Sequence, residues 1–195
     1  MNKKIIATVG ACALCVGLGV AGTLAWLTAT SDTVTNTFTT SDINITLTES
    51  NVNDDDSPNT NSYQMIPGFT ITKDPKVTVN EGSEDCWLFV KVEKSSNFDT
   101  FMTYTIADGW IALDGEQGVY YRSVMKNDTT KSFSVLEGNT VSVKNVKSAD
   151  MNGLNDNNKP TLTFTAYATQ YYSTNNTAMT PQSAWDAVKS ENTGA

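Results

Sequence analysis

Carboxylates are the side chains of this sequence best suited to acid–base chemistry, because histidine is absent from all 195 residues. Without histidine, no Ser-His-Asp or Cys-His pair can form, and histidine-dependent zinc sites are excluded. Glu84 with Asp85, or the acidic run at 54–56, could in principle cleave a glycosidic bond as a carboxyl pair. Both groups lie in expected turns, where acidic side chains are usually solvated. We therefore expect a protein that is not an enzyme.

Calcium is the metal that the oxygen-rich segments could bind. Asp54, Asp55 and Asp56 form one candidate, and Asp150 with Asn152 begins another. Carboxylate and amide oxygens are ligands of Ca²⁺, but neither segment matches an EF-hand loop with its closing glutamate. Asn and Asp side chains also bond nearby backbone in turns. We favour the turn role and expect no cofactor.

The N-terminus has the pattern of an export signal. Lys3 and Lys4 precede an apolar run over 5–21, and small residues then place cleavage between Ala25 and Trp26. The alternative is an uncleaved membrane anchor, since the uncharged run is long enough to span a bilayer. The whole sequence has a net charge of −8, and cleavage would remove two lysines and make the net charge still more negative. Such a charge disfavours nucleic acid and anionic lipid as partners. The membrane is expected as a partner only before cleavage.

Cleavage would leave a single cysteine, Cys86, because Cys12 and Cys15 lie in the apolar run. One cysteine cannot form an internal disulfide. Cys86 opens the apolar segment 86–90, so the pattern favours a small buried side chain. A reactive thiol or an intermolecular crosslink is the alternative.

Short alternating segments separated by turn residues predict an all-β, jelly-roll-like β-sandwich over 41–195. Cys86–Glu93 is apolar on both faces for half its length and is expected at the centre of a sheet. Thr161–Tyr171 alternates cleanly, and Phe98–Ile106 is expected as a further strand. Only a short C-terminal turn over Ser183–Lys189 has helical spacing.

Residues 26–40 form a segment of their own between the signal at 1–25 and the sandwich. The segment is rich in Thr and nearly uncharged, and Val34, Asn36 and Phe38 would share one strand face. An exposed N-terminal strand of this kind can add to the open sheet edge of a neighbour. A head-to-tail contact that does not close produces a filament.

Aromatic residues support a different possibility. They could line a sugar-binding face, although cross-strand packing is the commoner use of aromatics on sheets. The sequence leaves both uses open for Trp87, Trp110, Tyr120, Tyr121, Tyr171 and Tyr172.

Taken in order, these features resemble the TasA/camelysin family, the SipW-processed biofilm matrix proteins of Gram-positive bacteria, and its BsaA-like branch in particular. The resemblance is carried by the junction 22–27, by the strand-like blocks 34–38 and 43–47, and by the segments 66–68, 73–79 and 86–92.

The resemblance implies a jelly-roll sandwich that is cut by a SipW-type signal peptidase and polymerises into fibres. It also implies that the freed segment Trp26–Thr39 inserts as a strand into the next subunit. The metallo-endopeptidase activity attached to camelysin is not carried over, because the usual zinc ligands are missing.

The sequence therefore predicts a secreted structural subunit of the extracellular matrix or cell surface. Its partners would be further copies of itself, the SipW-type peptidase and other matrix proteins. A monomeric surface adhesin or carbohydrate-binding module is the main alternative, and a camelysin-type protease is a weaker one. Which sheet edge would accept the donor strand stays open.

Overall fold

The computed structural model describes residues 42–50 and 62–193. Backbone contacts divide the chain into two compact units, 1–40 and 41–195, and all described residues belong to the second. No helix within the described residues is long and apolar enough to cross a membrane. Outside the described residues lie the predicted cleavage site Ala25–Trp26, the strand residues Val34, Asn36 and Phe38, and the acidic run Asp54, Asp55 and Asp56.

One layer of the second unit is a four-stranded antiparallel sheet in the order β10-β4-β7-β6. Its central strand β4 pairs along its whole length with β10, from Leu162 opposite Lys94 to Gln170 opposite Cys86. The central place predicted for the segment at 86–93 is therefore confirmed. The strands are β4 (Cys86–Lys94), β6 (Ile111–Ala112), β7 (Val119–Val124) and β10 (Leu162–Gln170).

The other layer consists of two three-stranded antiparallel sheets, β1-β3-β8 and β2-β9-β5. Residues 73–75 connect β2 to β3. The connection from β8 to β9 contains a 3-10 turn at Glu137–Asn139. The strands are β1 (Ile45–Thr48), β2 (Thr70–Thr72), β3 (Lys76–Val79), β5 (Met102–Thr103), β8 (Ser132–Ser134) and β9 (Thr140–Val143).

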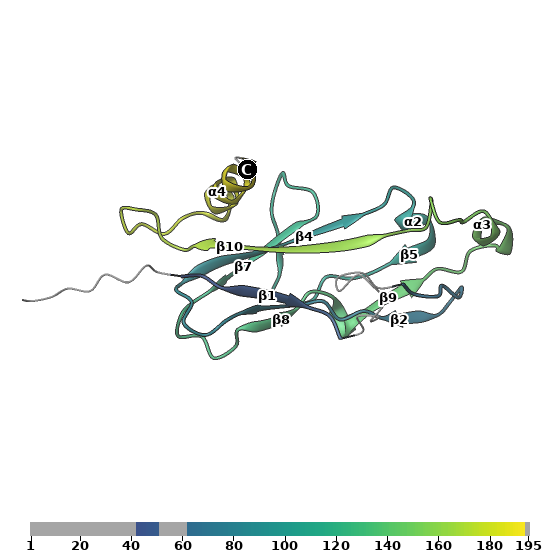
Figure 1. The fold of residues 1–195 in the computed structure, drawn as a ribbon, viewed down its shortest axis with the longest axis horizontal. Coiled ribbons are helices and arrows are strands. Elements are labelled where there is room, and N and C mark those ends of the chain that lie inside the picture. Colours follow the sequence, from purple (N-terminus) through teal and green to yellow (C-terminus); the bar gives the residue numbers. More distant parts are fainter. Residues whose placement is uncertain (1–41, 51–61, 194–195) are drawn as a thin grey trace, which may run out of the picture. The chain divides into compact units, whose positions relative to one another are not determined.

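The main core lies between the two layers (Figure 1). Leu88, Val90 and Val92 of β4 point into it and meet Val77 and Val79 of β3, all of them buried. The alternation along β4 thus places its three aliphatic residues on one face of the strand. The prediction of an all-β protein with antiparallel sheets is confirmed.

A helix covers the opposite face of β4. Trp87 and Phe89 point away from the main core and are buried against Trp185 and Val188 of α4 (Pro181–Thr193). The helix is longer than the predicted turn and begins at a proline, a residue favoured in the first helical turn. The sheet is thus covered on both faces.

The predicted strand at 98–106 is wrong in its first half. Phe98–Phe101 forms the short helix α2, and only Met102–Thr103 continues as β5. Helical spacing brings Phe98 and Phe101 to the same side, where both are buried with Val141 and Val143 of β9. A second short helix, α3 (Ser148–Asn152), contains Asp150 and Asn152, for which the sequence favoured a turn.

Cys86 is fully buried in the main core, as its apolar surroundings predicted. Burial raises the pKa of its thiol from the ordinary value of 9.0 to about 11. Above pH 9 the unfolded thiol releases its proton while the native thiol keeps it, so rising pH favours unfolding. Between pH 9 and about 11 we expect the free energy of unfolding to fall by about 1.4 kcal/mol per pH unit from this group.

Urea unfolding of the native chain and of Cys86→Ala over this pH range tests that expectation. The slope that Cys86 contributes is the difference between the two profiles, because all other titrating groups are common to both. Parallel profiles would contradict it.

Candidate functional site

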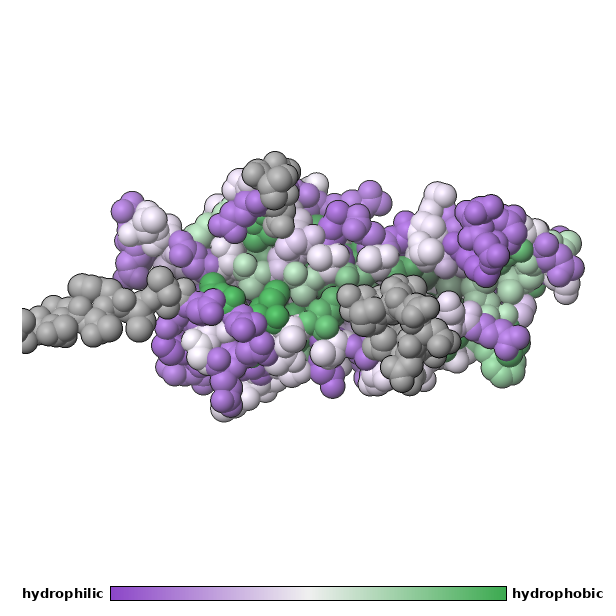
Figure 2. All heavy atoms as spheres, viewed as in Figure 1, coloured by the Kyte–Doolittle hydropathy of each residue, from purple (hydrophilic) through white to green (hydrophobic). Residues whose placement is uncertain are grey.

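Apolar side chains are partly exposed along the seam where β1 and β10 lie side by side (Figure 1). Six of them pack partly buried against the main core, whereas Leu47 lies outside that cluster and is 37% exposed. Figure 2 shows this hydrophobic surface running between hydrophilic residues of the two layers. We name as the apolar strip Ile43, Ile45 and Leu47 of the β1 segment with Leu162, Phe164, Ala166 and Ala168 of β10.

The edge of β1 on the side of the strip pairs with no described strand. Among the described strands β1 pairs only with β3. The carbonyl oxygens of Asn44 and Asp42 accept from Asn80 N–H (2.8 Å) and Glu84 N–H (3.3 Å). Successive residues of a strand direct their backbone groups to opposite sides. Ile43, Ile45 and Leu47 therefore direct theirs away from β3.

The same holds for β10, which pairs only with β4 among the described strands. Ser95 N–H donates to the carbonyl of Thr161 (3.0 Å), and Tyr171 N–H donates to the carbonyl of Asp85 (3.0 Å). Odd-numbered residues of β10 thus bond to β4, and even-numbered residues direct their N–H and C=O groups outward. These even-numbered residues, Leu162 to Ala168, are also those whose side chains form the strip.

The strip therefore combines two properties that an added strand requires. It offers backbone donors and acceptors that pair with no described strand, and it offers partly exposed apolar side chains beside them. A strand with alternating apolar residues could bond to the edge and cover the core in one step.

On the opposite side of the core, Arg122 of β7 lies against two aromatic rings. Its guanidinium lies 3.8 Å from the ring centre of Phe133 and 5.2 Å from that of Trp110. Trp110 Nε1 donates to the carbonyl of Ser134 (2.9 Å), which holds the indole against β8. Burial lowers the pKa of Arg122, the only arginine of the sequence. Arg122 thus covers the apolar rings on this side of the core, where β6 and β8 are the edge strands of their sheets.

Removing the Arg122 guanidinium should weaken the packing around Trp110 and Phe133. We expect Arg122→Ala to lower the free energy of unfolding by about 1–2 kcal/mol, since two aromatic rings lose the cation and its buried stem. Lys126→Ala is the matched control, because Lys126 pairs with Glu84 at the surface and should cost under about 1 kcal/mol. Equal losses in urea unfolding would contradict this role of Arg122.

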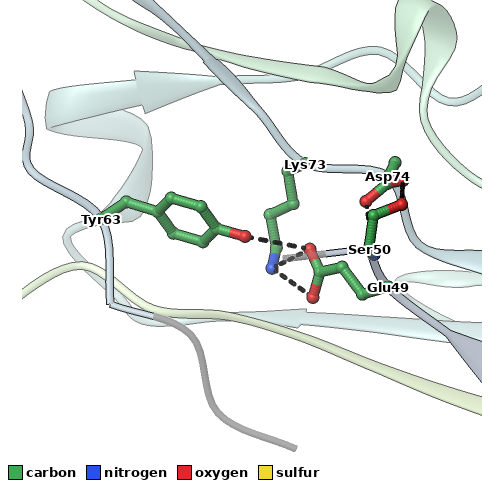
Figure 3. A network of polar contacts seen from close by, with 5 residues as sticks. All are labelled: Glu49, Ser50, Tyr63, Lys73 and Asp74. Atoms are coloured by element: carbon green, nitrogen blue, oxygen red, sulfur yellow. Dashed lines mark hydrogen bonds and ion pairs between the residues drawn. The ribbon is translucent and has the colours of Figure 1, made fainter. Parts of the chain in front are cut away.

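A polar network lies at the far end of β1 (Figure 3). Lys73 Nζ pairs with both carboxylate oxygens of Glu49 (2.8 and 3.1 Å), and Tyr63 OH donates to one of them (3.4 Å). The two charged side chains are only 13% and 19% exposed. Lys73 Nζ also lies 5.5 Å from the ring centre of Phe164, so the network reaches β10 and bounds the strip.

Ser50 and Asp74 complete the network. The backbone N–H of Ser50 donates to Asp74 Oδ1 (3.0 Å), and its hydroxyl donates to Oδ2. The hydroxyl bond is the main cause of the lowered pKa of Asp74. Each charge of the network has a partner, so its chemistry is that of a structural clamp between β1 and the segment before β3.

The other predicted candidates are separate from the strip. Glu84 pairs with Lys126 Nζ (2.7 Å), and Asp85 accepts the backbone N–H of Lys126 (2.6 Å). Asp150 and Asn152 are exposed on α3. Within residues 42–50 and 62–193, no three acidic, cysteine or histidine side chains gather as a metal site would require.

Most of the aromatic candidates are used in packing. Trp87 stacks on Tyr171 (5.0 Å between ring centres) and meets Tyr121 edge-on (5.7 Å), beneath the region of α4. Trp110 is buried, whereas Tyr172 is 40% exposed. Tyr120 is half-buried against the main core.

The fold places the chain among all-β proteins with antiparallel sheets and a C-terminal helix. No protein-family model matches the chain, and neither a curated protein nor a solved structure matches it. The function must therefore be argued from the strip itself. Sequence reasoning did not find the strip or the clamp, because both depend on which strands lie at sheet edges.

Proposed function

We propose that this chain is a secreted structural subunit of extracellular fibres, in which residues 26–40 of one copy add as a strand to the apolar strip of the next. The observation that carries the proposal is the coincidence of open backbone and uncovered core on the same residues of β1 and β10. An isolated domain gains nothing from leaving its core uncovered there. A polymer gains a site for a neighbouring strand.

The acceptor strand in this proposal is β10. It is nine residues long, whereas β1 has four, so it can bond to more of an added strand. Val34 and Phe38 of the donor would cover the partly exposed side chains of the strip. Donor binding would bury apolar surface and pair the outward N–H and C=O groups in the same event.

The resemblance to the TasA/camelysin family supports the same assembly and adds the processing step. We infer that cleavage after Ala25 by a SipW-type peptidase frees the donor segment, and that the strands are connected as a jelly roll. The strip is argued from its geometry, although Ile43, Ile45 and Leu47 lie in a block that also carries the resemblance.

Hydrogen exchange of a chain comprising 41–195, with and without a synthetic peptide of residues 26–40, tests the proposal. We expect the amides of Phe164 and Ala166 to exchange at least about tenfold more slowly when the peptide is present. A peptide with Val34→Asp and Phe38→Asp serves as the control and should give no protection. Unchanged exchange along both β10 and β1 would contradict the proposal.

A further inference from the structure

A rigid turn at Ile66–Phe69 precedes β2. Phe69 N–H donates to the carbonyl of Ile66 (3.0 Å), which closes the turn. Gly68 N–H donates to the carbonyl of Val143 (3.1 Å), and Val143 N–H donates to the carbonyl of Phe69 (2.8 Å). Gly68 has φ +80°, and a Cβ there would lie 2.7 Å from Asn145 Oδ1, so the turn requires glycine.

The turn holds large apolar side chains in water. Phe69 is 61% exposed and Ile66 is 44% exposed, and Pro67 between them is exposed as well. Single exposed apolar residues are ordinary, but a group of them on a fixed backbone is typical of a contact surface. A rigid aromatic side chain loses little conformational entropy on binding and often contributes most of the binding energy.

The turn and the entry of the chain into β1 lie at opposite ends of the same layer. In Figure 1, β1 begins at the left and β2, which follows the turn, lies at the right. At the entry end Glu84 N–H donates to the carbonyl of Asp42, and Tyr171 N–H donates to the carbonyl of Asp85. Tyr172, which is 40% exposed, follows directly. Each end therefore presents an exposed large apolar side chain.

Exposed lysines lie near the turn and exposed carboxylates lie at the entry end, among other charges of both signs. Lys144 and Lys147 are exposed just after the β9 residue that bonds the turn; within the described residues neither makes an ion pair, and Lys144 Nζ donates to the carbonyl of Asp99. Asp42 and Glu81 are exposed at the entry end and, in the described part of the chain, make no ion pair. Two copies placed end to end would bring these unlike charges together.

We propose that the Ile66–Phe69 turn is an end-contact surface that docks on the Tyr172 end of a second copy of this chain. The inference rests on the proposed function, because a donor segment continues directly into Asp42 of its own copy. A donor lying along the strip of one copy thus brings the entry end of its own copy to an end of that strip. In a head-to-tail filament, the entry end of one copy meets the opposite end of the next copy. That opposite end carries the turn.

Assembly of the chain beginning at Trp26 tests the inference. We expect the double variant Ile66→Ser/Phe69→Ser to raise the concentration needed for filaments by about tenfold or more, since truncating a central anchor residue costs over about 1 kcal/mol. Tyr172→Ser should have a similar effect, and combining it with the double variant should add less than the sum. Ile111→Ser is the matched control, because Ile111 is 55% exposed on β6, away from both ends.

Filaments of the double variant at the native concentration, with native filaments present, would overturn the inference and leave the proposed function intact. The absence of filaments from the native chain itself would instead overturn the proposed function and the inference with it.

Flotation with phosphatidylcholine vesicles tests the other partner that an exposed apolar turn could bind, which is a lipid surface. Vesicle binding that the double variant loses while its filaments stay normal would assign the turn to lipid and overturn the inference. Circular dichroism of each variant establishes that it is folded.

Discussion

Replacing Ala166 by aspartate is expected to leave the chain folded and to abolish its assembly into filaments. The Ala166 side chain lies in the middle of the apolar strip and is partly exposed in the single chain. A carboxylate there reaches water in the monomer but would be covered without a partner once a donor strand adds. Burying an unpaired charge costs on the order of 3–5 kcal/mol, which raises the concentration needed for assembly by roughly a hundredfold or more.

Thr165→Asp is the matched control for this prediction, because it adds the same charge to the same strand. Thr165 lies opposite Lys91 and outside the core of the strip, on the other face of the sheet. We expect this variant to assemble close to the native concentration, as measured by sedimentation and negative-stain electron microscopy. Assembly of Ala166→Asp at the concentration of Thr165→Asp would contradict the acceptor role of β10.

The largest loss of stability is expected for Phe89→Ala. Phe89 is fully buried between the sheet and α4, with its ring centre 5.2 Å from that of Trp185 and 6.4 Å from that of Tyr121. Truncation removes the side chain that joins the helix to β4 and leaves a cavity. The free energy of unfolding should fall by about 3–5 kcal/mol, measured by urea titration.

Phe69→Ala is the natural comparison, since it removes the same ring from a mostly exposed position. We expect it to change the free energy of unfolding of the single chain by under about 1 kcal/mol. A loss as large as that of Phe89→Ala would mean that Phe69 stabilises the fold, and would weaken its assignment as a contact residue.

The long strands could be predicted from the sequence because their side-chain pattern is local. Leu88, Val90 and Val92 alternate with Trp87 and Phe89, and a strand apolar on both faces must be covered twice. The structure supplies the two covers, which are the second layer and α4. The pattern could not show that the second cover is a helix from the C-terminus.

Features that depend on pairing over long distances were not predictable. Phe98 fits the alternation that continues with Met102 and Tyr104, whereas Phe101 breaks it. One pair at helical spacing is too little to predict a helix, and the packing of both rings against β9 decides for it. Arg122 has no neighbour in sequence that identifies its place between two aromatic rings. The strip likewise follows from β1 and β10 both being edge strands, which is a property of sheet order alone.

The central claim is that an N-terminal strand of one copy completes the fold of the next. Its most direct test is negative-stain electron microscopy of two purified chains in parallel, one beginning at Trp26 and one at Ser41, over a range of concentrations and times. We predict regular filaments from the longer chain and a folded monomer from the shorter one. Filaments of normal yield from the chain that begins at Ser41, or a persistent monomer from the chain that begins at Trp26, would contradict the account.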